Sequence, residues 1–189
     1  MKKALALILG IFFFCSSFVY AAETYTIDPS HTAVIWHISH FGFSHPTGKW
    51  MVSGTILFDE AHPDKSTVEV TIPVNAITTG DPELDKHLNA PLFFDTEKFP
   101  TATFVSNKID LTGKESAKIY GTLTLHGVAK PVTLTVKLNK MGPNPLSHLQ
   151  SMGLTGSTTI KRSDFGIVAL LPGLGDDVTI EIELEANKK

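Results

Sequence analysis

The stretch IYGTLTLHGVAKPVTLTVKL, residues 119–138, indicates the fold class most clearly. Apolar side chains alternate with polar ones on both sides of a short interruption at 127–131. A period of two gives each strand one apolar and one polar face, and so short a connection joins two such strands as a hairpin. One wet face per strand is typical of antiparallel sheet, so this stretch predicts an all-β protein with antiparallel strands.

The same alternation recurs along the rest of the chain. It is clear at 68–74 and 178–185 and weaker at 32–40, 50–58, 102–106 and 152–161. Residues typical of turns, mainly glycine, proline and aspartate, separate these runs. About eight amphipathic strands predict a closed barrel, because closure removes exposed strand edges and eight strands enclose room for one small ligand.

One segment has the pattern of a short helix instead. Asp81 is a suitable N-cap, and a proline and an acidic residue follow it in the first turn. Leu84, His87 and Leu88 then fall on one helical face before Pro91. The spacing predicts a single helix over 83–90.

The first residues have the pattern of a secretory signal peptide. Two lysines precede an uninterrupted apolar run at 4–14, which is too short to cross a bilayer, and Val19 and Ala21 suit cleavage after Ala21. We therefore expect a signal peptide at 1–21 and one domain at 22–189. The mature chain would carry 14 basic and 19 acidic residues, a formal charge of −5, and no cysteine. A thiol-free domain suits the oxidising periplasm.

Composition and missing motifs exclude several function classes. The whole chain has 16 basic and 19 acidic residues and no basic run, so we expect no nucleic-acid partner. A single cysteine cannot build a disulfide framework or a cysteine-based zinc site. The nucleophile elbow, the phosphate-binding loop and the dinucleotide fingerprint are all missing.

The histidines leave one possibility open. Four of them lie within the segment 31–45, but His37 and His40 are an odd number of residues apart and so point to opposite faces of a strand. Surface or strand-end positions explain them more simply, and we expect no metal site, although the sequence alone leaves metal binding by this segment open. Asp85 and His87 face different sides of a helix, so a turn contact and a packing role are favoured over an acid–base pair.

Short motifs then follow one another in a specific order along the chain. They include Tyr25-Thr26-Ile27-Asp28-Pro29-Ser30-His31, His40-Phe41-Gly42, Asp85-Lys86-His87-Leu88, Phe93-Phe94-Asp95, Lys98-Phe99-Pro100, Leu123-Thr124-Leu125-His126-Gly127, Lys161-Arg162-Ser163-Asp164-Phe165-Gly166 and Gly175-Asp176-Asp177-Val178.

In this order and spacing, the motifs resemble the YceI-like domain, a bacterial periplasmic lipid-binding family. The resemblance implies an extended, lipocalin-like β-barrel with an interior tunnel. It implies a long-chain amphiphile as ligand: a polyisoprenoid, an isoprenoid quinone, or a fatty acid or amide. It implies no catalytic activity and no cofactor other than such a bound lipid. The expected protein is soluble, whereas transient membrane contact and the oligomeric state, a homodimer included, stay open.

The apolar phase of the strands supplies candidates for a ligand-binding wall, since such pockets are mostly apolar. The candidates are Val34, Trp36, Ile38, Val52, Ile56, Phe58, Val70, Ile72, Phe104, Gly121, Leu123, Leu134, Leu154, Ile160 and Ile180. The same side chains could instead fill a solid core. Two other functions therefore remain open: a hydrolytic or isomerising enzyme acting on such a lipid, and a solid-core, stress-related structural protein.

Two further expectations concern access and room. The 83–90 helix and the apolar 168–174 segment are candidates for a gate at the barrel mouth. Gly54, Gly121 and Gly156 fall on the apolar phase of their strands, where missing side chains give either curvature or a channel. On the channel hypothesis, Gly121→Leu would displace lipid from a barrel that still folds.

Overall fold

The computed structural model describes residues 22–189, so the predicted signal peptide at 1–21 lies outside the described residues. The strands are β1 (Glu23–Ile27), β2 (Ala33–His40), β3 (Thr47–Met51), β4 (Ser53–Phe58), β5 (Thr67–Pro73), β6 (Thr101–Leu111), β7 (Ser116–Leu125), β8 (Val128–Pro143), β9 (Gln150–Lys161) and β10 (Leu174–Lys188). The helices are α1 (Pro82–Asn89) and three short 3₁₀ turns, η1 (Pro63–Lys65), η2 (Val74–Ala76) and η3 (Arg162–Phe165).

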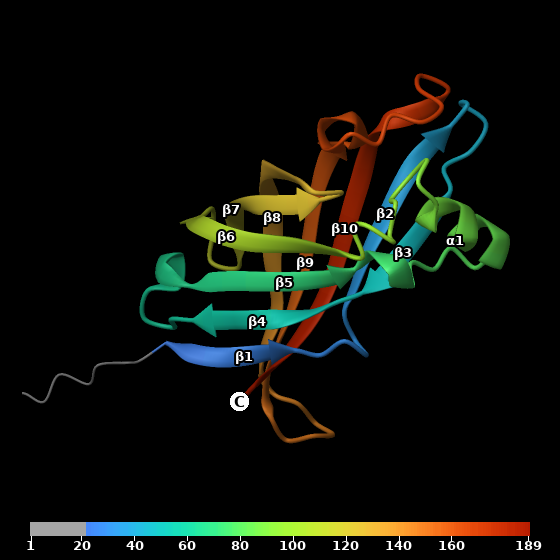
Figure 1. The fold of residues 1–189 in the computed structure, drawn as a ribbon. Coiled ribbons are helices and arrows are strands. Elements are labelled where there is room, and N and C mark those ends of the chain that lie inside the picture. The colour runs from blue at the N-terminus through green and yellow to red at the C-terminus, as the bar shows by residue number, and fades with distance from the viewer. Residues whose placement is uncertain (1–21) are drawn as a thin grey trace, which may run out of the picture.

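Eight of the strands form a closed ring. Every neighbouring pair is antiparallel, in the order β1-β4-β5-β6-β7-β8-β9-β10, and the ring closes where β1 pairs with β10 (Figure 1). The closing register places Tyr25 opposite Lys188 and Ile27 opposite Ala186. The prediction of a closed antiparallel barrel with one helix is confirmed.

The two remaining strands extend the barrel beyond β1. β2 pairs with β10 along the same edge as β1 but nearer the start of β10, and β3 pairs with β2. A turn at Asp28 separates β1 from β2, and there Thr32 replaces the missing strand contacts. The Thr32 hydroxyl donates to the Glu185 carbonyl oxygen at 3.2 Å and accepts from the Glu185 amide at 3.1 Å. The strand β1 itself was not expected from alternation.

The hairpin predicted over 119–138 is formed by β7 and β8, but its turn is tighter than the sequence predicts. The turn consists of His126 and Gly127, with φ of 52° and 74°, between the paired residues Leu125 and Val128. Two residues with positive φ twist in the direction that joins right-handed strands, which explains the glycine. The strands therefore run to 125 and from 128.

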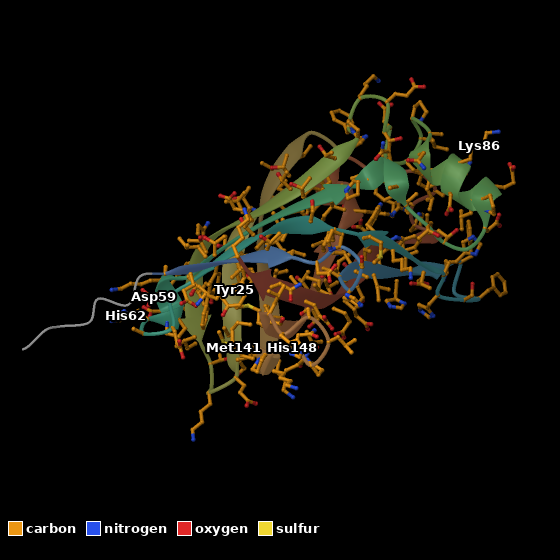
Figure 2. All side chains as sticks on the ribbon, turned by 90° about the horizontal axis from the view of Figure 1, so that it is seen from below. Tyr25, Asp59, His62, Lys86, Met141 and His148 are labelled. Atoms are coloured by element: carbon orange, nitrogen blue, oxygen red, sulfur yellow. The ribbon has the colours of Figure 1, made fainter. Side chains whose placement is uncertain are left out.

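The segment between β5 and β6 covers one end of the barrel. Asp81 caps α1 as predicted, its carboxylate accepting from the amides of Glu83 at 3.0 Å and Leu84 at 3.4 Å. Behind the helix, the Phe94 ring meets the Trp50 indole edge-on at 5.6 Å. α1 thus lies at the end of the barrel away from Tyr25, and Figure 2 shows Lys86 of α1 far from Tyr25.

The opposite end of the barrel is filled by side chains. Tyr25, Ile27, Met152 and Ala186 are almost completely buried in one cluster there. Such packing leaves no passage through this end, in keeping with the density of protein interiors. The barrel is therefore a cup, with its floor near the β1–β10 closure.

The close packing around Gly121 contradicts the channel hypothesis at this position. A Cβ added to Gly121 would overlap the Phe104 ring and the Val105 carbonyl oxygen, so Phe104 already occupies the space that the glycine leaves. The β6–β7 register also shifts between Ser106 and Lys108, beside Gly121. Close packing at a bulge explains this glycine, as the curvature hypothesis expected.

We therefore expect Gly121→Leu to damage the fold rather than to fill a channel. Forcing Phe104 and the β6 backbone apart should lower the free energy of unfolding by about 3 kcal/mol or more, at or beyond the upper end of overpacking costs. Denaturant unfolding of the variant measures this loss. An unchanged unfolding midpoint together with loss of bound lipid would restore the channel hypothesis.

Candidate ligand-binding cavity

The barrel holds an internal cavity of about 550 Å³. Its wall is built from alternate residues of the strands, and the residues between β5 and β6 close one side. Its volume falls within the range of about 300–1,000 Å³ that is typical of small-molecule sites. All the wall residues predicted from the sequence line this cavity except Phe58 and Gly121. Whether these residues contact a ligand stays a prediction.

The two exceptions have clear physical reasons. Phe58 lies on the apolar face of β4 but nearer the filled end, where its ring packs edge-on against Tyr25 at 6.2 Å. Gly121 is covered by Phe104, which itself forms part of the wall. Alternation finds the inward face of a strand, but it does not tell at what depth the packed core ends.

Further wall residues lie outside the predicted set. They include Trp50, Val68, Val74, Leu84, Leu88, Phe93, Phe94, Ile119, Leu125, Val132, Val136, Gly156, Leu174, Val178, Ile182 and Leu184. Most share the phase of a predicted neighbour on the same strand, so the same alternation would have found them. Leu84 and Leu88 lie on the predicted apolar face of α1, and Phe93 and Phe94 follow the helix.

Three segments surround the open end of the cavity. The β2–β3 connection contributes Ser44 and Pro46, α1 contributes Leu84, and the segment before β10 contributes Ile167 and Leu170. Both segments predicted as a gate therefore lie at the mouth. Gating itself stays a prediction.

A buried arginine was missed by the sequence analysis. Arg162 is 5% exposed, lines the cavity and, among the described residues, is its one side chain with a permanent charge. The wall candidates taken from the apolar phase of the strands therefore did not include this charged position. The even phase of β9, which points Leu154 and Ile160 inward, extends to Arg162 and could have revealed it.

The Arg162 guanidinium holds the mouth segment together. Nε donates to the Gly175 carbonyl oxygen at 2.7 Å, Nη1 to that of Ile167 at 3.0 Å, and Nη2 to those of Ala169 at 2.8 Å and Leu174 at 3.0 Å. Burial lowers the Arg162 pKa, and the charge of nearby Asp176 opposes this shift. Only a planar group with several fixed donors can satisfy four carbonyls at once.

Asp176 fixes the other side of this segment. Its carboxylate accepts from the Ser163 amide at 2.9 Å and from the Ser163 hydroxyl at 2.8 Å. The bond from the Ser163 amide is the main reason that the Asp176 pKa lies below its usual value, and the hydroxyl bond adds to it. The carboxylate is thus stabilised in its charged form.

This shift predicts an acid dependence of stability. A depressed pKa in the folded state means that Asp176 stabilises the fold above the unfolded-state pKa of about 4 and loses this contribution as pH falls through the folded value. Asp176→Asn should therefore be less stable than the wild type near neutral pH, by a margin that shrinks below about pH 4. Denaturant unfolding over a pH series measures the margin, and a margin independent of pH would contradict this role.

The remaining candidate groups have structural roles. In the described part of the chain, no three histidine, cysteine or acidic side chains come together as metal ligands. Asp85 accepts from the Thr79 amide and hydroxyl, both at 2.7 Å, and the His87 ring packs on Phe93 at 4.9 Å. The turn and packing roles expected for these two residues are confirmed.

Helices long and apolar enough to cross a membrane do not occur among residues 22–189.

The pattern that builds this barrel matches a known family. The sequence model of the YceI-like domain matches residues 25–186. The chain belongs to the YceI family. A UPF0312 protein of Pseudomonas aeruginosa is 39% identical over 189 aligned positions, which cover 98% of this chain and 97% of the relative. The family membership inferred from the motifs is confirmed.

Solved structures share the YceI barrel. BcnA of Burkholderia cenocepacia is 25% identical with a TM-score of 0.76, and the match covers 84% of this chain and 98% of BcnA. A polyisoprenoid binding domain from Saccharophagus degradans, implicated in plant cell wall breakdown, is 18% identical with a TM-score of 0.67 over 87% of this chain and 98% of that domain. At this identity the second likeness shows the fold alone.

Proposed function

We propose that this protein binds and carries a long-chain amphiphile, such as a polyisoprenoid, an isoprenoid quinone, or a fatty acid or amide. The observation that carries the proposal is the cavity of about 550 Å³ with an almost entirely apolar wall. Each buried methylene of a ligand contributes about 0.8 kcal/mol, so a few isoprene units give tight retention. The domain from Saccharophagus degradans that shares this fold is a polyisoprenoid binding domain, so the fold itself is compatible with this class of ligand.

The polar groups of the cavity favour binding over catalysis. Arg162 directs most of its donors to backbone carbonyls, and the His87 ring packs on Phe93. No hydrogen bond joins a nucleophile to a base among the described cavity residues. An acid–base or nucleophilic mechanism needs such a pair within hydrogen-bond reach. A binding protein that releases its lipid unchanged fits this arrangement better than an enzyme.

Mass spectrometry of an organic extract of the purified protein tests the proposal. We expect one lipid species in near-stoichiometric amount, and delipidated protein should take up oleic acid or a polyprenol again. A chemically altered lipid after incubation would support an enzyme. An empty extract with no uptake of either probe would support a solid-core structural protein.

We propose that the protein works in the periplasm after export. The two lysines and the apolar run at 4–14 support a cleaved signal peptide. Intact-mass measurement of periplasmic protein should give the mass of a chain that begins at Ala22 or, with one more residue removed, at Glu23. The full-length mass in the membrane fraction would contradict cleavage.

A further inference from the structure

Two turns at the mouth of the barrel expose large apolar side chains to solvent. On the β2–β3 connection Phe43 is 92% exposed and Phe41 about half exposed. On the segment before β10, Val168, Leu170 and Leu171 are also exposed. We name these five residues the apolar collar. Exposed apolar groups gathered in this way usually mark an interaction surface.

The apolar collar is one structural unit. The Phe41 amide donates to the Gly173 carbonyl oxygen at 2.9 Å, and the Phe41 ring lies directly against Gly173. Figure 1 shows the two turns side by side at the same end of the barrel, far from the β8–β9 turn at the other end. The five side chains are therefore presented together.

Neither turn carries a permanently charged side chain, and His45 is the one titratable residue in them. Residues 41–46 and 166–175 contain no aspartate, glutamate, lysine or arginine. Surface turns ordinarily carry polar residues. Because folding leaves these apolar side chains in water, moving them into an apolar environment would be favourable. An uncharged surface also gives a charged protein partner nothing to pair with.

The apolar collar coincides with the opening of the cavity. Leu170 is half exposed and also lines the cavity, and Ser44 and Pro46 of the β2–β3 connection line it as well. A lipid that leaves through this opening passes these residues. In water that step would expose its hydrocarbon, whereas a mouth placed within a bilayer surface would not.

We propose that the apolar collar inserts into the surface of a lipid bilayer, with the cavity mouth facing the hydrocarbon. The purpose of this contact rests on the proposed function, but the contact itself does not. The side chains stand on protruding turns rather than in a groove, and a fluid bilayer accepts such a shape without a complementary surface. Aromatic and aliphatic side chains are the groups that insert at membrane interfaces.

Vesicle flotation tests the proposal. The chain used is residues 22–189, which contain every strand of the closed barrel and lack the apolar run at 4–14, which would itself bind lipid. We expect binding to vesicles of neutral phosphatidylcholine, with little change on adding salt, because the contact is apolar. Phe43→Ser combined with Leu171→Ser should weaken binding by about tenfold or more for each side chain.

Matched variants separate this effect from general loss of apolar surface. Leu146 is 90% exposed on the β8–β9 turn, and Figure 2 places His148 of that turn far from Lys86 of α1. Leu146→Ser should therefore bind vesicles like the wild type, and Phe43→Trp should retain binding with a blue-shifted indole emission on vesicle addition.

The outcomes distinguish this proposal from the proposed function. A wild type that holds lipid in its extract but does not float with vesicles would overturn the membrane contact and leave a protein as the partner of the apolar collar. Equal weakening by Leu146→Ser would also overturn it. Vesicle binding that depends on the apolar collar, in a protein with an empty extract, would support the contact and contradict the lipid carrier.

Discussion

Replacing Arg162 by leucine is expected to lower the free energy of unfolding by about 3–5 kcal/mol, because a buried acceptor left without its donor costs about 1–3 kcal/mol and three of the four bonds lost are only partly buried. Four carbonyl oxygens, from Ile167 to Gly175, would lose their donors. Total stabilities are about 5–15 kcal/mol, so this is a large share. The free energy of unfolding of Arg162→Lys should lie between those of the wild type and Arg162→Leu, because one ammonium group cannot reach all four carbonyls.

Amide hydrogen exchange localises the effect. Exchange over 167–175 should rise much more in Arg162→Leu than exchange in the floor of the barrel. Lys161→Leu is the matched control: Lys161 is the preceding residue, but it is exposed and makes only surface ion pairs, with Asp177 at 2.8 Å and with Asp176 at 3.9 Å. Surface ion pairs contribute about 0–1 kcal/mol, so this variant should be close to the wild type. Unchanged exchange over 167–175 in Arg162→Leu would refute the role given to Arg162.

Replacing Gly156 by leucine is expected to reduce lipid affinity by about tenfold or more, since displacing two methylenes already costs about 1.6 kcal/mol. Gly156 lies in the cavity wall between Ile182 and Val136, and a Cβ there would make ordinary contacts, 3.4 Å from Ile182 and 3.6 Å from Val136. The outer atoms of leucine would then extend into the cavity. Gly156→Ala should retain most of the affinity.

Gly153 provides the control for this experiment on the same strand. It lies opposite Glu185 on the outer face of β9, and a Cβ there would meet no atom within 4 Å. Gly153→Leu should leave both lipid affinity and folding intact. Oleic acid titration of the delipidated proteins measures affinity, with the unfolding midpoint measured alongside. Normal affinity in a folded Gly156→Leu protein would place the lipid outside this cavity.

Local patterns predicted most of the fold. Alternation identified most strands and their inward faces, and Asp81 with its proline identified the helix. The first strand was missed because Glu23–Ile27 is short, and its pairing with β10 is a long-range contact that no local pattern reports. The turn at His126 was placed too late because positive φ is uncommon for any residue other than glycine, so the alternation was continued through His126.

The strand faces that line the cavity were predicted, but the extent of the empty space between them was not. Phe58 and Gly121 have the correct phase, yet one lies beside the filled floor and the other lies beneath Phe104. Depth and side-chain overlap depend on how the whole sheet curves. The phase of β9 could have placed Arg162 inward, but its role could not be predicted because its partners are backbone carbonyls, which leave no mark in the sequence.

The pairing of β1 with β10 also determines how late in synthesis the barrel can close. The first and last strands of the ring meet where Tyr25 lies opposite Lys188, so no shorter stretch of chain can seal the barrel. Contacts between segments so distant in sequence form slowly. We expect a chain that is still being synthesised to remain open and unfolded until residue 188 is available, a state that would suit the export proposed above. Protease resistance of chains truncated before β10, compared with full-length chains, measures this delay.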